Sequence, residues 1–274
     1  MYPKSYYGLS VSKNSEYLAH YLNGIVNSSL TNYFLFMTAS SWGIARKTLM
    51  MQNIARLPVP FPTESNTHIV SQIVDLERQL IESYNTPNTS AYLDLKKQLD
   101  DAVFALYGLD ETEQALVKDT VSITIDLYMN REESAALRQP SIPELELYAT
   151  ELISSIQPFL QTLRERILVA DVIQVDKSPL QVVKFSFLPT PGREHVVQIT
   201  QAQELKAVLN RIAEQLPQQI ADRVFTRRDL RIYNGQDIYI VKPAQKRYWS
   251  RSAGLNDADL ILSEHLRVNR AAIG

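Results

Sequence analysis

The residue types that most often carry out chemistry are scarce or scattered in this chain of 274 residues. There is no cysteine, and the four histidines stand far apart, so neither a cysteine nucleophile nor a zinc site is expected. Asp237 and Lys242 could belong to a metal-nuclease site, but the second acid that such a site needs is missing from their segment. The sequence also has no phosphate-binding loop and no serine nucleophile elbow. What remains is the chemistry of binding.

Basic side chains gather at two places in the chain. The overall net charge is only −2, but residues 1–62 carry +4 and residues 223–251 carry +6. Residues 252–274 carry −1, which leaves −11 on residues 63–222. This asymmetry favours polyanion contact at the two basic segments and protein contact or solubility in the acidic middle. The alternative is that it merely follows from solvated helix faces.

Lysine and arginine attract phosphates whatever the sequence of the nucleic acid, and aromatic rings can stack on bases. We therefore predict DNA contacts from both basic segments. The predicted DNA-binding residues are Ser41, Trp42, Arg46, Lys47, Arg227, Arg228, Arg231, Lys242, Lys246, Arg247, Trp249 and Arg251. The competing interpretations are that Trp42 plugs a domain and that the second basic segment is an ordinary hairpin with a positive surface.

Helices are expected to position the first basic segment. Apolar residues recur at helical spacing between residues 18 and 37, after a capping residue at Asn14 or Ser15. A loop follows from Ser40 to Gly43, and alternating prolines then mark an extended exit segment that ends at Pro62. Further helical patterns cover residues 67–81, 93–106 and 110–128, of which the first two form a helical hairpin.

A mixed pattern follows the linker at residues 138–143. It predicts a helix that ends near Leu168, strands at 172–175, 182–188 and 195–199, and a helix over 203–216. Asn234-Gly235 between alternating apolar residues predicts a β-hairpin, and Asn256 or Asp257 is expected to cap a final helix. The fold class is therefore α+β. The expected parts are residues 1–62, a helical spacer at 63–139 and a small α/β domain at 140–274.

Two segments of the chain resemble a known family. The stretch LNGIVNSSLTNYFLFMTASSWGIARKTLMMQNIARLPVPFP, residues 22–62, resembles the end of a target recognition domain in restriction-modification systems. Residues 99–121, LDDAVFALYGLDETEQALVKDTV, resemble an element that follows this domain in many N6-adenine DNA methyltransferases and fused restriction-methylation enzymes. The two segments cover roughly the first half of the chain. The end of the chain resembles C-terminal extensions found with methyltransferase and phage-defence genes.

The resemblance implies a role in DNA recognition without catalysis. A methyltransferase of this kind needs an Asn/Asp-Pro-Pro-aromatic motif to hold a flipped adenine, and no Pro-Pro pair occurs in the chain. We therefore expect no cofactor here, with S-adenosylmethionine bound by a partner or by a missing N-terminal part. A recognition domain of this family usually exceeds the 62 residues before Thr63, so this chain departs from the family there.

The expected partners are duplex DNA and an N6-adenine DNA methyltransferase, with a possible homodimer through residues 67–130. Two alternatives stay open: a docking or dimerisation subunit without DNA contact, and an unrecognised nuclease or toxin. The nuclease alternative predicts acids clustered near the basic hairpin. The chain has neither an apolar run of about 18 residues nor a signal-peptide pattern at its start, so a cytoplasmic protein with no membrane contact is expected.

Overall fold

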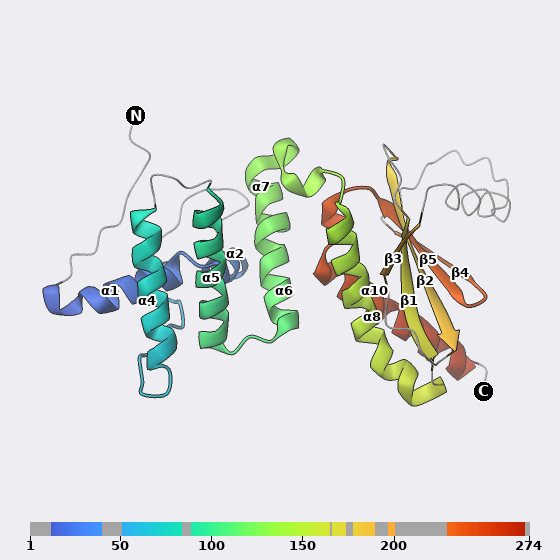
Figure 1. Cartoon of the computed structure of the whole chain (residues 1–274), viewed down its shortest axis with the longest axis horizontal. Helices are drawn as coiled ribbons and strands as arrows, with labels where there is room; N and C mark the ends of the chain where they lie inside the picture. Colours follow the sequence, from blue (N-terminus) through green and yellow to red (C-terminus); the bar gives the residue numbers. More distant parts are fainter. Residues whose placement is uncertain are drawn as a thin grey trace. The chain divides into compact units, whose positions relative to one another are not determined.

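The structure is a computed structural model that describes residues 12–39, 51–83, 89–164, 166–173, 178–189, 197–200 and 229–271 (Figure 1). The chain divides into two compact units, Met1–Arg131 and Glu132–Gly274. The described part of the first unit is helical, whereas the second combines helices with a sheet, which confirms the α+β class. Within the described residues, no helix has the length and apolar character needed to cross a membrane.

The described part of the N-terminal unit is mainly helical. Its elements are η1 (Lys13–Ser15), α1 (Glu16–Val26), α2 (Ser29–Thr38), α3 (Met51–Ile54), α4 (Thr67–Glu82), α5 (Ser90–Tyr107), α6 (Glu111–Asp119), η2 (Thr120–Ile125) and α7 (Asp126–Asn130). α1, α4 and α5 share one core that includes Tyr21, Ile73 and Val103. α1 of the predicted recognition segment therefore packs directly on the predicted spacer helices.

The boundary between α5 and α6 follows from local sequence. Gly108 takes up a left-handed conformation (φ 68°) at the end of α5, where a residue with a Cβ would be strained. Asp110 and Glu113 then form a capping box: each side chain accepts a hydrogen bond from the backbone N–H of the other residue. Gly108 therefore terminates α5, and the capping box starts α6.

The helix predicted over residues 110–128 contains an irregularity. Thr120–Ile125, which reads TVSITI, is π-helical and separates α6 from α7. β-branched side chains crowd the preceding turn of an α-helix, and a π-helical turn is wider. The segment leads to Tyr128, whose ring centroid lies 5.7 Å from that of Phe36 on α2.

The C-terminal unit is a five-stranded sheet with two long helices against one face (Figure 1). Its elements are η3 (Arg131–Glu133, which starts at the unit boundary), η4 (Ala135–Leu137), α8 (Ile142–Arg164), β1 (Arg166–Ile173), β2 (Leu180–Pro189), β3 (Val197–Thr200), β4 (Leu230–Asn234), β5 (Asp237–Pro243), η5 (Lys246–Tyr248) and α10 (Arg251–Ala271). The strand order is β3-β1-β2-β5-β4, and only the β1–β3 pair is parallel.

Alternate side chains of β1, β2 and β5 form the main core with α8 and α10. Ala170, Phe185 and Ile240 belong to this face, and all are fully buried. The opposite face carries a second buried group that includes Val182 and Val241. The hairpin predicted at Asn234-Gly235 is confirmed, with Gly235 at φ 63° between β4 and β5.

Several predicted boundaries in this unit are wrong. The strand expected at 172–175 is β1, which runs from Arg166 to Ile173. α8 ends at Arg164 instead of near Leu168, because the β-branched run that follows pairs with β2 as strand β1. α10 starts at Arg251, so Asp257 lies inside the helix and does not cap it. The helix expected over 203–216 lies outside the described residues.

Gly254 lies where α10 packs closely on α8. A Cβ atom added there would lie 2.6 Å from the backbone oxygen of Tyr148, whereas one added at Gly24 would meet the Ile73 side chain at 2.7 Å. Gly254→Ala is expected to destabilise the C-terminal unit by about 1–3 kcal/mol, because backbone yields less easily than a side chain. Urea unfolding followed by Trp249 fluorescence, in a chain that carries Trp42→Phe, measures this effect. An unchanged midpoint would show that the helices do not approach so closely.

Candidate functional site

The predicted DNA-binding residues divide into two sets. Ser41, Trp42, Arg46, Lys47, Arg227 and Arg228 lie outside the described residues. The structure places Arg231, Lys242, Lys246, Arg247, Trp249 and Arg251, all in the C-terminal unit.

Lys242 and Trp249 are core residues. The Lys242 side chain is 7% exposed and donates hydrogen bonds to the Asp257 carboxylate and to the carbonyl oxygen of Tyr248, the latter at 3.2 Å. Trp249 is 1% exposed, and its indole N–H donates to the Pro243 carbonyl at 2.9 Å. Neither side chain offers a surface on which DNA could bind or stack, so the structure argues against both as contact residues.

A buried polar cluster surrounds the Lys242 ammonium group. Asp257 also accepts a hydrogen bond from the Tyr148 hydroxyl at 2.5 Å, and the Tyr148 ring lies 5.0 Å from the lysine nitrogen. Burial lowers the pKa of Lys242, although the charge of Asp257 opposes this shift. Burial and the same carboxylate raise the pKa of Tyr148 well above its ordinary value. The cluster is therefore a satisfied ion pair closed off from solvent.

Arg231 lies on edge strand β4 and is surrounded by acids. Its guanidinium nitrogens lie 2.8 Å from Asp229, 3.1 Å from Glu264 and 3.9 Å from Asp257. The nuclease alternative predicted acids near the basic hairpin, and these acids are indeed there. Each, however, is within ion-pair distance of Arg231, and Asp257 also pairs with Lys242, so the three carboxylates share two cations.

The other three basic residues also contact their own unit. Lys246 lies 3.1 Å from Glu144, and Arg251 lies 2.7 Å from Glu151. The Arg247 guanidinium stacks 4.7 Å from the Tyr248 ring centroid. Burial alone would raise the pKa of Glu144, but hydrogen bonds from Arg138, Ser141 and Lys246 outweigh burial and lower it to about 2.

The sequence analysis missed the acids that pair with these bases. Glu144 and Glu151 lie on α8 and pair with Lys246 and Arg251. Asp257 and Glu264 lie on α10 and pair with Lys242 and Arg231. The positions of these acids along their helices do not indicate which basic residues they pair with. Of the six predicted DNA-binding residues that the structure describes, most therefore have their charge paired with an acid of the same unit.

The two candidate nuclease residues do not come together. They lie five residues apart on β5, so Lys242 projects toward α10 and Asp237 toward the opposite face. Asp237 accepts a hydrogen bond from Ser186 at 2.6 Å and lies 3.5 Å from Lys184, which also lies 3.9 Å from Asp171. In the part of the chain that the structure describes, no group of three or more acids or histidines could hold a metal ion.

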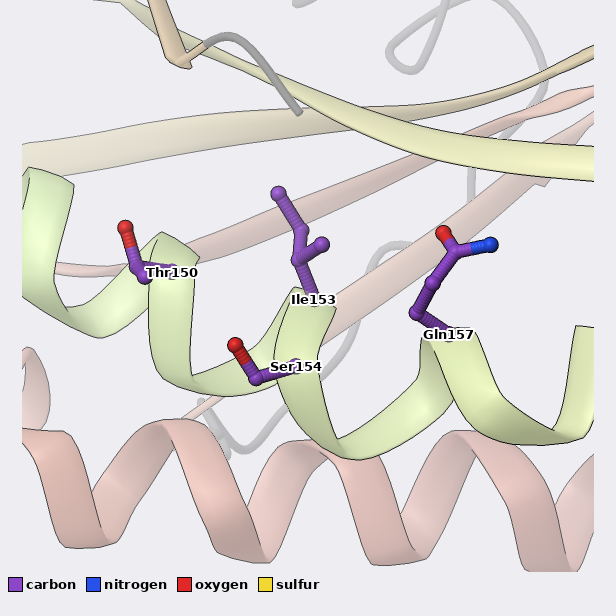
Figure 2. Close-up of a pocket in the computed structure, with 4 residues that line it drawn as sticks. All are labelled: Thr150, Ile153, Ser154 and Gln157. Carbon is purple, nitrogen blue, oxygen red and sulfur yellow. The ribbon is translucent and has the colours of Figure 1, made fainter. Parts of the chain in front are cut away.

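A small cavity of about 260 Å³ lies beside α8. Figure 2 shows Thr150, Ile153 and Gln157 projecting from the helix toward the strands. The Gln157 side-chain oxygen already accepts a hydrogen bond from the Leu168 N–H at 3.0 Å, and Ile153 belongs to the core. The described lining carries no charged group, so the cavity gives no basis for catalysis.

In the N-terminal unit, a buried carboxylate joins α1 to α4. Glu77 of α4 is 3% exposed, and its oxygens lie 2.5 Å from the His20 Nδ1 and within hydrogen-bond distance of the Asn23 amide. Beside this contact, Gly24 lets the two helices approach closely. Asn23 and Gly24 belong to the LNGIVNSSL motif, so part of the motif fixes helix packing.

A second contact joins the two segments that carry the family resemblance. The Ser29 N–H and hydroxyl donate to the two carboxylate oxygens of Asp100 at 2.7 and 2.6 Å. The Tyr21 hydroxyl also donates to the carbonyl oxygen of Pro60 in the exit segment at 2.6 Å. The motif on α1 and α2, the LPVP exit and the LDD motif on α5 therefore lie in one folded unit.

Comparisons with protein-family models, with curated proteins and with solved structures found no match to this chain.

Proposed function

We propose that the chain is the non-catalytic DNA-recognition part of an N6-adenine DNA methyltransferase, in a cytoplasmic restriction-modification or phage-defence system. It combines an N-terminal partial recognition domain, a helical spacer and a small C-terminal α/β domain. S-adenosylmethionine would be bound by a partner subunit or by a missing N-terminal part.

The contact between Ser29 and Asp100 is the observation that carries this proposal. Two short motifs can resemble a family by chance, but these motifs are joined by a pair of hydrogen bonds across 71 residues. A spacer helix that fixes the last helices of a recognition domain accounts for this contact. The packing of α1 on α4 and α5 agrees with the same arrangement.

Ion pairs and burial in the C-terminal unit reduce the set of residues that we propose to contact DNA. Lys242 and Trp249 are buried, and Arg231 and Arg251 are held by acids, so these side chains are poorly placed to neutralise phosphates. Lys246 is also held by an acid, Glu144, whereas Arg247 contacts Gln245 and Tyr248 and no described acid. The proposed contact residues are therefore Ser41, Trp42, Arg46, Lys47, Arg227, Arg228 and Arg247.

Removal of Arg46 and Lys47 tests this assignment. Duplex DNA binding by the full chain is measured over a salt series, for the wild type and for Arg46→Ala/Lys47→Ala. Two lost phosphate contacts should lower the slope of log K against log salt by about 2. The matched control is Arg78→Ala/Lys97→Ala, which removes one arginine and one lysine from exposed positions on α4 and α5.

Equal slopes for the two double variants would contradict a specific contact at Arg46 and Lys47. The same titration is repeated with a candidate N6-adenine DNA methyltransferase present. If the wild-type chain binds no DNA under either condition, the recognition function is rejected.

A second candidate function is docking without DNA contact. It is favoured by the internal pairing of the described C-terminal bases, which leaves little positive surface for phosphates. This function predicts a stable complex with the methyltransferase, or a homodimer through residues 67–130, whose formation does not depend on DNA. Light scattering of the chain alone and of its mixture with the enzyme distinguishes these two assemblies.

A further inference from the structure

Arg247 differs from the other described basic residues around the hairpin in how its charge is used. It lies in η5, a few residues after β5, and is partly exposed. Among the residues that the structure describes, no carboxylate lies within ion-pair distance of its guanidinium group, whereas the neighbouring Lys246 pairs with Glu144. Arg247 therefore keeps a charge that a ligand could neutralise.

Two nearby side chains fix the direction of this guanidinium group. The Arg247 Nε–H donates to the side-chain oxygen of Gln245 at 2.9 Å, and the group lies 4.7 Å from the centroid of the Tyr248 ring. Arginine has five side-chain N–H donors, of which the described residues accept from this one alone. The four donors on Nη1 and Nη2 are therefore available to a ligand while the rest of the group is held.

The backbone of η5 is held in turn by buried groups. The Pro243 carbonyl accepts hydrogen bonds from the Gln245 N–H at 2.8 Å and from the Trp249 indole N–H at 2.9 Å. The Tyr248 carbonyl accepts one from the Lys242 ammonium group at 3.2 Å. Both Lys242 and Trp249 are buried, so η5 cannot shift without disturbing the core. These two residues thus support the segment that carries the free guanidinium donors.

We infer that Gln245, Arg247 and Tyr248 form a preorganised phosphate-binding site, in which Arg247 donates to two phosphate oxygens and the other two residues position it. The Nη groups of a guanidinium form a planar pair of donors whose geometry matches two oxygens of a phosphate. Because the side chain is already ordered, binding costs little further rotamer entropy.

The charges of this region favour phosphate over a carboxylate. Arg138 and Lys246 both pair with Glu144, so that two cations share one anion. With Arg247, the three bases exceed this acid by two positive charges. Such an excess matches one phosphate dianion or two adjacent phosphodiesters of DNA better than a single carboxylate. In taking duplex DNA as the source of the phosphate, the inference rests on the proposed function; inorganic phosphate offers the same chemistry without DNA.

The test is a titration of the full ¹⁵N-labelled chain with inorganic phosphate at constant ionic strength, followed by NMR. The Arg247 Nε–H and the backbone amides of η5 should shift saturably with phosphate, much less with acetate and not with chloride. The spectrum of Arg247→Lys identifies the Nε–H signal by its absence. Arg78 on α4 is the control: it is exposed, and no described acid lies within ion-pair distance of it.

Arg247→Lys keeps the charge and removes the planar pair of donors, so phosphate affinity should fall about tenfold. Gln245→Ala frees the guanidinium to rotate and should lower the affinity about threefold, with an unchanged urea midpoint. Arg78→Lys makes the first substitution at an arginine without these neighbours and should change nothing. Duplex DNA affinity should fall about threefold to tenfold in Arg247→Lys with an unchanged salt slope, because the charge remains.

The phosphate site and the recognition function fail separately. The inference is overturned if phosphate does not shift the η5 amides saturably, if acetate binds as tightly, or if Arg247→Lys or Gln245→Ala binds phosphate like the wild type. If phosphate binds at η5 while the chain binds no DNA, the phosphate site stands, free phosphate or a phosphate monoester is its ligand, and the recognition function fails. If Arg247→Lys loses phosphate but binds DNA like the wild type, the site stands and DNA is not its ligand.

Discussion

Lys242→Ala is expected to destabilise the C-terminal unit by about 3 kcal/mol or more, because the variant leaves the buried carboxylate of Asp257 without its lysine partner. The Asp257 side chain is only 6% exposed and cannot recover this interaction from water. The Tyr148 hydroxyl stays hydrogen-bonded to it, and Arg231 lies 3.9 Å away, so the charge is not wholly unpaired. Urea unfolding monitored by Trp249 fluorescence, in a Trp42→Phe chain, measures the loss.

Two further variants show whether burial is the cause. Lys184→Ala removes a lysine whose side chain is 23% exposed and whose carboxylate neighbours reach solvent, so its cost should stay below about 1 kcal/mol. Lys242→Met/Asp257→Leu removes both buried charges and should recover most of the stability that Lys242→Ala loses. Equal costs for Lys242→Ala and Lys184→Ala would show that the Lys242 pair is open to solvent.

Trp249→Ala is expected to cost about 3–5 kcal/mol, the typical range for removal of a fully buried aromatic side chain. The indole packs edge-on against Tyr148, with ring centroids 5.0 Å apart, and its N–H donates to the Pro243 carbonyl. Trp249→Phe keeps most of the apolar contact and loses this hydrogen bond, so it should cost about 1–2 kcal/mol plus the effect of its smaller ring. The loss of stability in both variants is measured by circular dichroism and by hydrogen exchange of α8, neither of which needs the tryptophan signal.

This series also separates structure from DNA contact. If Trp249 only supports the core, any loss of DNA affinity in Trp249→Ala should follow the loss of folded protein and disappear at temperatures where the variant is folded. A variant as stable as the wild type that binds DNA poorly would instead indicate that the indole stacks on DNA.

Local chemistry predicted the parts of this fold that depend on neighbouring residues. Asn234-Gly235 predicted the β4–β5 hairpin, because few other residue pairs accept positive φ in such a turn. The helical repeats of α4 and α5 were likewise visible from the sequence. The end of α8 was not, since an apolar run such as RILVADVI suits a buried helix or a strand until its partner β2 is known.

The candidate site shows the other limit. Basic residues around the hairpin could be found from the sequence, but their acidic partners on α8 and α10 could not, because pairing depends on how the helices lie on the sheet. Asp257 was expected at a helix cap, which is its common local role, and the structure instead places it inside α10 beside Lys242. The Ser29–Asp100 contact spans 71 residues and has no local signature at all.

The π-helical segment Thr120–Ile125 makes the length of this region as important as its composition. A π-helical turn holds about one residue more than an α-helical turn, so a regular α-helix of the same length from α6 to α7 would put the following residues one residue out of phase. Everything that follows would then rotate by about 100° around the helix axis. Tyr128 would turn away from Phe36, and the chain would enter the linker to the second unit from a different side of the helix.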